Sequence, residues 1–194
     1  MGTALDILSR EDASAFGRIY AVANYSRLAD EVLRLFAVDC ARHALSTVQN
    51  PDPRSVRAWK VAEKFAIGQA TEEELREARL EAQAAALEAE SSRFCPKTAA
   101  VYDAVRYVAT PSAAKSAYYV AGRYSHVVYR PGSMHSWSLG AAESNHTRRD
   151  RKEAIAAEDE RQITVLKELI ATHYSLPAPV PQRRMHPESL HAGV

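Results

Sequence analysis

The sequence predicts an all-α protein, an array of about seven helices with short connections and an extended C-terminal tail. From Leu5 to Tyr174 the apolar residues recur every three or four positions, which is the period of an amphipathic helix. Glycine and proline, which interrupt helices, number only 7 and 9 among 194 residues. Alanine, the strongest helix former, fills much of the remainder. No alternating run typical of a strand is long enough to compete.

Composition narrows the class of protein. The chain is long enough to bury a core without disulfides, and we expect one helical domain over residues 1–175 and a Pro-rich, poorly ordered tail over 176–194. The net charge of +1 gives no overall attraction to nucleic acid or membranes. No stretch approaches the roughly 20 apolar residues that a membrane span needs, and no secretory signal is visible. The two widely separated cysteines fit a reduced compartment, so we expect a cytoplasmic bacterial protein.

N-caps, prolines and a glycine indicate where the helices begin and end in the first half of the chain. Residues 3–24 predict one or two short helices, with Ser9 and Asp12 as N-caps. A long helix follows over 26–48 and ends at the prolines of 50–53. The next helix has Asp52 as its N-cap, Pro53 in its first turn and Gly68 at its end. A further helix runs from Thr71 to Glu90, with three glutamates in its first turn, where the helix dipole favours acids.

In the second half, Pro96 and Pro111 each open a helix, and the last helix ends near His173. Residues 133–147 are ambiguous. A helix that began at Thr147 would carry four bases of the run 148–152 in its first turn, against the dipole. Either this helix begins earlier, near Ser136 or Ser138, or the basic run serves a partner; we favour the earlier start.

A resemblance to a known family rests on three segments of the sequence. They are the helical segment 33–45 (Leu-Arg-Leu-Phe-Ala-Val-Asp-Cys-Ala-Arg-His-Ala-Leu), the segment 58–68 that begins Ala-Trp-Lys, and the Glu-rich segment 71–79. Together they resemble a group of Ala-rich, all-helical bacterial proteins described as putative immunity proteins. The resemblance covers residues 30–90, and the helix around 160–170 is also similar. It implies a helical fold and an immunity-like or accessory role, and it supplies no catalytic residues.

Residues with catalytic or metal-binding chemistry are few. Asp39, Cys40 and His43 lie within one helical turn, but no oxyanion loop accompanies them, so we interpret them as an Asp–His pair beside a buried cysteine. His126 and two further histidines of the least regular region, His135 and His146, lack the spacing of a metal site. Phosphate-binding glycine loops are absent. We therefore predict no catalytic residue, no metal and no cofactor, and keep an enzyme of unknown class as the second alternative.

The remaining signal is a charge asymmetry. Between residues 97 and 152 nine bases face three acids, a net charge of +6, whereas residues 71–90 carry −5. On the helix after Pro111, five basic and aromatic residues fall on one continuous face. They are Lys115, Tyr119, Arg123, His126 and Arg130.

We predict that this face binds a macromolecular partner, expected to be another protein. Two alternatives stay open: nucleic-acid binding by the basic 97–152 region, or a solvated face that pairs with the Glu-rich helix of the same molecule. The sequence does not indicate the oligomeric state.

Overall fold

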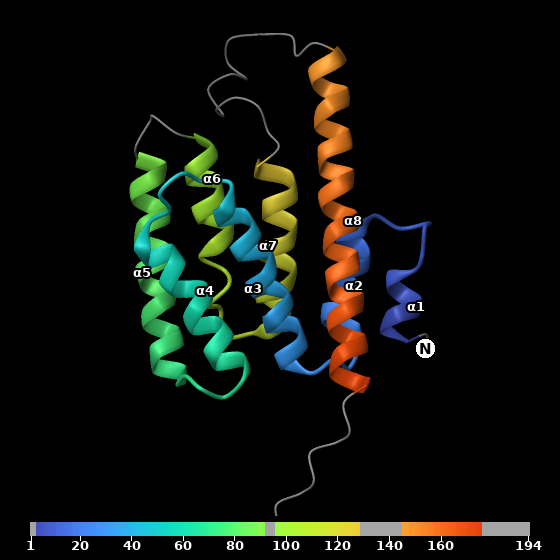
Figure 1. Cartoon of the computed structure of the whole chain (residues 1–194), viewed down its shortest axis with the longest axis horizontal. Coiled ribbons are helices and arrows are strands. Elements are labelled where there is room, and N and C mark those ends of the chain that lie inside the picture. Colours follow the sequence, from blue (N-terminus) through green and yellow to red (C-terminus); the bar gives the residue numbers. More distant parts are fainter. Residues whose placement is uncertain (1–2, 92–95, 129–144, 176–194) are drawn as a thin grey trace, which may run out of the picture.

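Figure 1 shows the fold of the protein in a computed structural model, which describes residues 3–91, 96–128 and 145–175. These residues form helices and no strand, so the all-α prediction is confirmed. The predicted tail of 176–194 and the ambiguous segment up to residue 144 lie outside the described residues. The helices are α1 (Ala4–Leu8), α2 (Ala15–Tyr25), α3 (Asp30–Ser46), α4 (Pro53–Ala66), α5 (Glu72–Ser91), α6 (Pro96–Val105), α7 (Ala113–Val128) and α8 (Asn145–Ser175).

Helix α3 is the centre of the bundle. It contacts α4, α6, α7 and α8, with α4 and α5 on one side of it in Figure 1 and α8, α2 and α1 on the other. Val32, Phe36, Cys40 and Ala44, four residues apart in turn, are buried. Six more positions, at 33, 34, 37, 38, 41 and 45, are buried as well. A helix that is surrounded on several sides buries residues around much of its circumference rather than along a single stripe.

The central helix also buries a charge. Arg34 is only 5% exposed, and its guanidinium donates to the backbone carbonyls of Thr110 (3.0 Å) and Pro111. The same guanidinium lies 4.7 Å from the centre of the Phe65 ring. These contacts give a buried cation hydrogen-bond acceptors and an aromatic face, which offset its loss of hydration. Arg34 thereby joins the α6–α7 connection to α3 and α4.

The caps predicted for the first two helices were wrong. Thr3 caps α1: its Oγ1 accepts from Asp6 N at 3.2 Å, while the Asp6 carboxylate accepts from Thr3 N at 2.7 Å. Ser14 caps α2 through the Gly17 N–H, at 3.1 Å. Ser9 is instead the C-cap of α1, and Asp12 pairs with Arg10 in the connection. Thr-x-x-Asp at residue 3 has the same capping-box spacing as Ser-x-x-Asp at residue 9, so spacing alone did not choose between them.

The predicted boundaries of α4 and α5 are confirmed. Asp52 accepts from Arg54 N at 2.8 Å, and Pro53 is the first residue of α4. Gly68 follows the C-cap with φ +74°, a left-handed conformation that glycine adopts without strain. Thr71 and Glu74 form a capping box at the start of α5, where Thr71 N donates to the Glu74 carboxylate at 2.7 Å.

Helix α8 packs lengthwise against α1, α2, α3 and α7. Its buried apolar residues are Ile163, Leu166 and Ile170, all in the C-terminal half. The described part of the chain begins this helix at Asn145; the favoured start near Ser136 or Ser138 falls on residues that are not described. Among the described helices, none is both long enough and apolar enough to cross a bilayer.

Candidate partner-binding surface

Three of the five residues predicted to bind a partner have described side chains, and all three come from α7. Lys115 is exposed, Tyr119 is partly buried, and the Arg123 side chain is 41% exposed. His126 belongs to the same helix but its side chain is not described, and Arg130 lies outside the described residues. The predicted face therefore exists over at least its first three members, on one helix.

Arg123 has an acidic neighbour within the molecule. Asp103 of α6 accepts from both Arg123 and Arg106, the latter at 2.7 Å. The two guanidinium groups lie 5.0 and 4.9 Å from the centre of the Tyr107 ring. Two cations around one carboxylate leave this cluster with an excess positive charge beside an aromatic ring.

Three acids of the Glu-rich helix pair with α4. Glu88 of α5 binds Arg54 of α4 at 2.6 Å, and Glu81 and Glu77 of α5 bind Arg57 of α4. Arg123 pairs instead with α6.

A chain of touching aromatic rings continues from the arginines across α7 to α2. Tyr107 stacks on Tyr119 with ring centres 4.8 Å apart, and Tyr118 lies 4.3 Å from Tyr119. Tyr118 in turn meets Tyr20 edge-on at 5.2 Å. Tyr20 also contacts Phe16 and Tyr25, at 6.5 and 6.2 Å. We call this surface the aromatic band; it comprises Phe16, Tyr20, Tyr25, Tyr107, Tyr118 and Tyr119.

The α2 end of the band is open to solvent. Phe16 and Tyr20 are each 38% exposed, and Tyr25 is 67% exposed. The hydrogen bond to Tyr119, together with burial, raises the pKa of Tyr118 to about 12. The Tyr118 phenol is therefore neutral at physiological pH, and the band offers rings and hydroxyl groups rather than negative charge.

The α2 half of this surface was not predicted from the sequence. Phe16 and Tyr20 are four residues apart, so they share one face of the helix. That face borders the one that carries Ile19 and Val22 into the core, and Ala23 lies between the two. Large aromatic residues at the edge of the core face of a short helix were the available signal.

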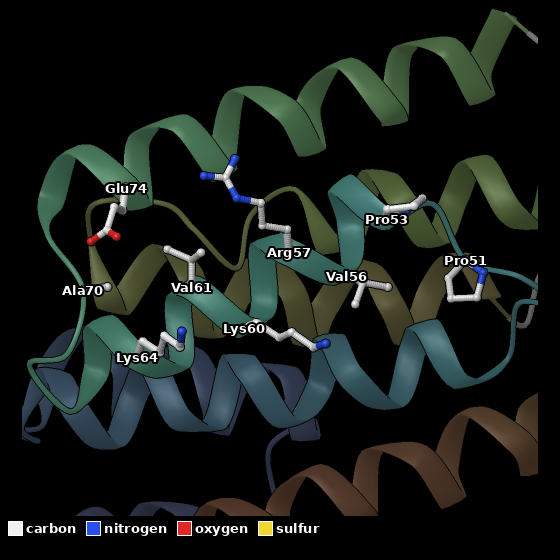
Figure 2. A pocket seen from close by; sticks show the side chains of 9 residues that line it. All are labelled: Pro51, Pro53, Val56, Arg57, Lys60, Val61, Lys64, Ala70 and Glu74. Atoms are coloured by element: carbon white, nitrogen blue, oxygen red, sulfur yellow. The ribbon is translucent and has the colours of Figure 1, made fainter.

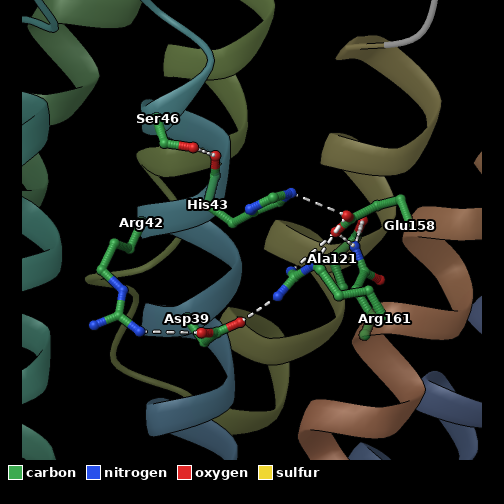
Figure 3. A network of polar contacts seen from close by, with 8 residues as sticks. Asp39, Arg42, His43, Ser46, Ala121, Glu158 and Arg161 are labelled. Carbon is green, nitrogen blue, oxygen red and sulfur yellow. Dashed lines mark hydrogen bonds and ion pairs between the residues drawn. The ribbon is translucent and has the colours of Figure 1, made fainter. Parts of the chain in front are cut away.

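Two members of the predicted cluster, Asp39 and His43, form a polar network with α8 (Figure 3). Arg161 donates to Asp39 at 2.6 Å and to Glu158 at 2.9 Å. His43 Nε2 lies 3.2 Å from the Glu158 carboxylate, whose side chain is only 2% exposed. The network joins the central helix α3 to α8.

This geometry is not that of a nucleophile and its base. Cys40 is completely buried, and burial raises the pKa of its thiol well above the ordinary value. His43 is turned toward Glu158, and its ring meets that of Tyr124 edge-on at 5.6 Å. Asp39 is held by Arg161 and by Arg42. In the described residues, no group of three His, Cys, Asp or Glu side chains is placed to hold a metal ion.

A groove of about 630 Å³ lies on another side of the bundle, along α4 and the start of α5 (Figure 2). Its walls combine apolar side chains with three cations and one acid. The lining residues are Pro51, Pro53, Val56, Arg57, Lys60, Val61, Lys64, Ala70 and Glu74.

Fold and surface together define an all-helical protein with one central helix and a solvent-facing aromatic band. The chain matches the family described as Imm-5 like putative immunity protein over residues 23–168, which is most of its length, and it belongs to that family. The resemblance read from residues 30–90 and from the helix around 160–170 is thereby confirmed. The family description points to a non-catalytic role and to a partner protein. Comparisons with curated proteins and with solved structures give no match.

Proposed function

We propose that this protein is a non-catalytic, cytoplasmic immunity protein that binds a partner protein through the aromatic band and the adjoining basic face of α7. The proposed contacts on α7 are Lys115, Tyr119 and Arg123, continued by His126 and Arg130. The partner is a protein of the toxin type that an immunity protein neutralises. Binding itself, rather than chemistry on the partner, is the proposed activity.

The observation that carries this proposal is the composition and continuity of the band. Tyrosine and arginine are enriched among residues that dominate binding energy, because they offer a large apolar area together with hydrogen-bond donors. Single exposed apolar residues are ordinary on protein surfaces, whereas a contiguous group of them marks an interaction site. Here three of the most exposed aromatic side chains, Phe16, Tyr20 and Tyr25, touch one another or a shared neighbour.

The non-catalytic part of the proposal is supported by the family and by the Cys40 surroundings. The thiol has no exposure to solvent, and the neighbouring His43 and Asp39 each lie against a charged residue of α8. Formation of a thiolate at this position would place an unsolvated charge in the core.

The test begins with co-purification from the native host, with the products of the neighbouring genes as first candidates. The captured partner is then purified, and its affinity for the full chain is measured by calorimetry. The double variant Tyr20→Ser/Tyr25→Ser should weaken binding at least tenfold, since each ring of this kind is worth about 1–2 kcal/mol at the centre of an interface. Replacing both Arg123 and Arg130 with Glu should abolish capture while helicity stays unchanged, and the melting temperature should fall because Arg123 no longer pairs with Asp103.

Leu80→Ser provides the matched control. Leu80 is 53% exposed on α5, so its loss removes a comparable exposed apolar group away from the band. If the tyrosine double variant and the arginine double variant both bind the partner as tightly as the unmodified protein, the chosen surface is wrong. Retention of DNA or RNA at low salt, with a steep loss as salt is added, would instead favour the nucleic-acid alternative.

A further inference from the structure

The groove along α4 differs in chemistry from the aromatic band and shares no residue with it. Its α4 members recur at positions 53, 56, 57, 60, 61 and 64, which is one face of the helix. At 1.5 Å per residue this face is about 16 Å long. Helix α4 contacts α3, α5 and α6. The groove is therefore a second surface, independent of the proposed function.

The groove has apolar residues at both edges of the α4 face, since Val56 and Val61 are five residues apart and lie about 140° from each other around the helix, with Lys60 and Lys64 between them. Val56 and Val61 are half-buried and pack against the core, and Pro51 and Ala70 extend the apolar surface at the two ends. Figure 2 shows these side chains spread along the helix rather than closed around one point. A small molecule needs a site that covers most of its surface, whereas an open, elongated groove suits a segment of polypeptide.

Two of the four charged groups in the groove already have partners. Arg57 pairs with Glu81 and Glu77 of α5. Glu74 accepts from Thr71 N and Oγ1 at 2.7 and 3.0 Å, and these hydrogen bonds lower its pKa. Both groups are therefore committed to holding α4 and α5 together.

Lys60 and Lys64 are the charges left over. Both are exposed, and neither forms an ion pair with any residue in the described part of the chain. They are four residues apart, so they lie on the same face with about one helical turn between them. Lys60 has one weak contact, 5.7 Å from the centre of the Trp59 ring. Lys64 also lies near enough to Glu74 to contribute to the lowering of the Glu74 pKa. The groove thus combines apolar side chains with two exposed ammonium groups, spaced by one turn, that form no ion pair within the described residues.

We propose that this groove binds an acidic amphipathic segment of a partner protein, with an apolar side chain against Val56 and Val61 and two carboxylates, three or four residues apart, facing Lys60 and Lys64. Carboxylates at that spacing lie one turn apart on a helix and match the spacing of the lysines. An apolar side chain beside the acids can pack against Val56 and Val61, whereas a nucleic-acid backbone has no apolar group to place there. About eleven residues of helix fill the length of the groove.

The experiment selects ligands without assuming their identity. A phage-displayed library of random 16-residue peptides is panned against the immobilised full-length protein, and enriched peptides are synthesised and titrated by fluorescence anisotropy. The expected peptides carry two acids three or four residues apart beside Leu, Ile or Phe. Their affinity should fall at least tenfold for Lys60→Glu/Lys64→Glu. Methyl resonances of Val56 and Val61 should shift on binding.

The control changes the same amount of charge elsewhere. Arg149→Glu/Lys152→Glu alters two exposed bases on α8 and should leave peptide affinity within twofold of the unmodified protein. Circular dichroism confirms that all variants keep their helicity. Enriched peptides without acids, equal binding to the Lys60 and Lys64 variant, or no enrichment would overturn the inference. Oligonucleotide binding that is lost in this variant would assign the groove to nucleic acid instead. Peptides whose affinity falls for Tyr20→Ser/Tyr25→Ser belong to the aromatic band and are set aside, so the remaining outcomes report on the groove alone.

Discussion

The ring of Phe16 on α2 occupies the space that a β-carbon on Gly122 of α7 would fill. A β-carbon built on Gly122 would lie 2.7 Å from Phe16 Cδ2 and closer still to Cε2. Glycine at this position therefore allows the Phe16 ring to lie against the backbone of α7. The position of one solvent-exposed ring of the aromatic band depends on a missing side chain.

The first prediction is that Gly122→Ala changes the free energy of unfolding in opposite directions in the presence and in the absence of the Phe16 ring. Gly122→Ala should lower the free energy of unfolding by about 1–3 kcal/mol, because the ring must move. In a Phe16→Ala background the same substitution should raise the free energy of unfolding by up to about 1 kcal/mol, since alanine is the better helix former. Urea unfolding of the four proteins measures both effects. Equal effects in the two backgrounds would show that the contact does not constrain the helices.

The second prediction concerns the buried network of α3 and α8. A double-mutant cycle of Glu158→Ala and Arg161→Ala should give a coupling of about 1.5–3 kcal/mol, because the Glu158 carboxylate is 2% exposed. Arg149 and Glu153, on the same helix, form a pair with 79% and 64% exposed side chains. Their cycle should give less than about 0.5 kcal/mol. Similar couplings for the two pairs would contradict the buried role of Glu158.

The third prediction tests the N-cap of α4. The hydrogen bond and ion pair with Arg54 lower the pKa of Asp52. Asp52→Ala should lower the free energy of unfolding by about 1 kcal/mol at neutral pH, and Asp52→Asn by less, because asparagine still caps the helix. Because the pKa of Asp52 is lower in the folded state, ionised Asp52 stabilises the protein at every pH above its unfolded-state pKa, near 3.9. This stabilisation is lost as the pH falls through the folded-state pKa. The difference between Asp52→Asn and the unmodified protein should therefore shrink in acid.

The fourth prediction concerns alkaline pH. Burial raises the pKa of the Cys40 thiol in the folded state. In the unfolded state the thiol has its ordinary pKa, near 8.5. Between these two pKa values the unfolded state therefore binds fewer protons than the folded state. The free energy of unfolding should consequently fall as the pH rises above about 8.5. Cys40→Ala should remove this part of the pH dependence, whereas Cys95→Ala serves as the matched thiol control.

Thiol labelling checks the same residue directly. Cys40 should react with a thiol reagent only under conditions that unfold the bundle. Rapid labelling of Cys40 in the native protein would contradict its burial and would reopen the enzyme alternative.

Local rules predicted those parts of the fold that depend on residues close in sequence. The Asp52 and Thr71 caps, the prolines at 53 and 96, and the left-handed Gly68 each act within a few residues. Such signals are legible in a single sequence because the physical cause and its effect lie within one helical turn. The choice of Thr3 and Ser14 over the predicted caps shows the limit where two equivalent signals compete.

The parts that sequence reasoning missed depend on which helices meet. Asp39 and Arg161 are 122 positions apart, and the Arg34 guanidinium reaches carbonyls 76 and 77 positions away. Phe16 and Gly122 likewise meet only because α2 packs against α7. Periodicity assigns each helix an apolar face but does not name the neighbour that covers it. For the same reason, the sequence could not show that Arg123 pairs with Asp103 of α6.

The pairing of α3 with α8 has a consequence for synthesis. A growing chain exposes Asp39 and His43 long before Glu158 and Arg161 leave the ribosome. Until then the central helix lacks both the ionic contacts and the apolar cover that α8 provides. We expect prematurely terminated chains to be recognised and degraded, because their interior stays open to proteases. A cell that relies on this protein would then accumulate only molecules that were translated through their last helix.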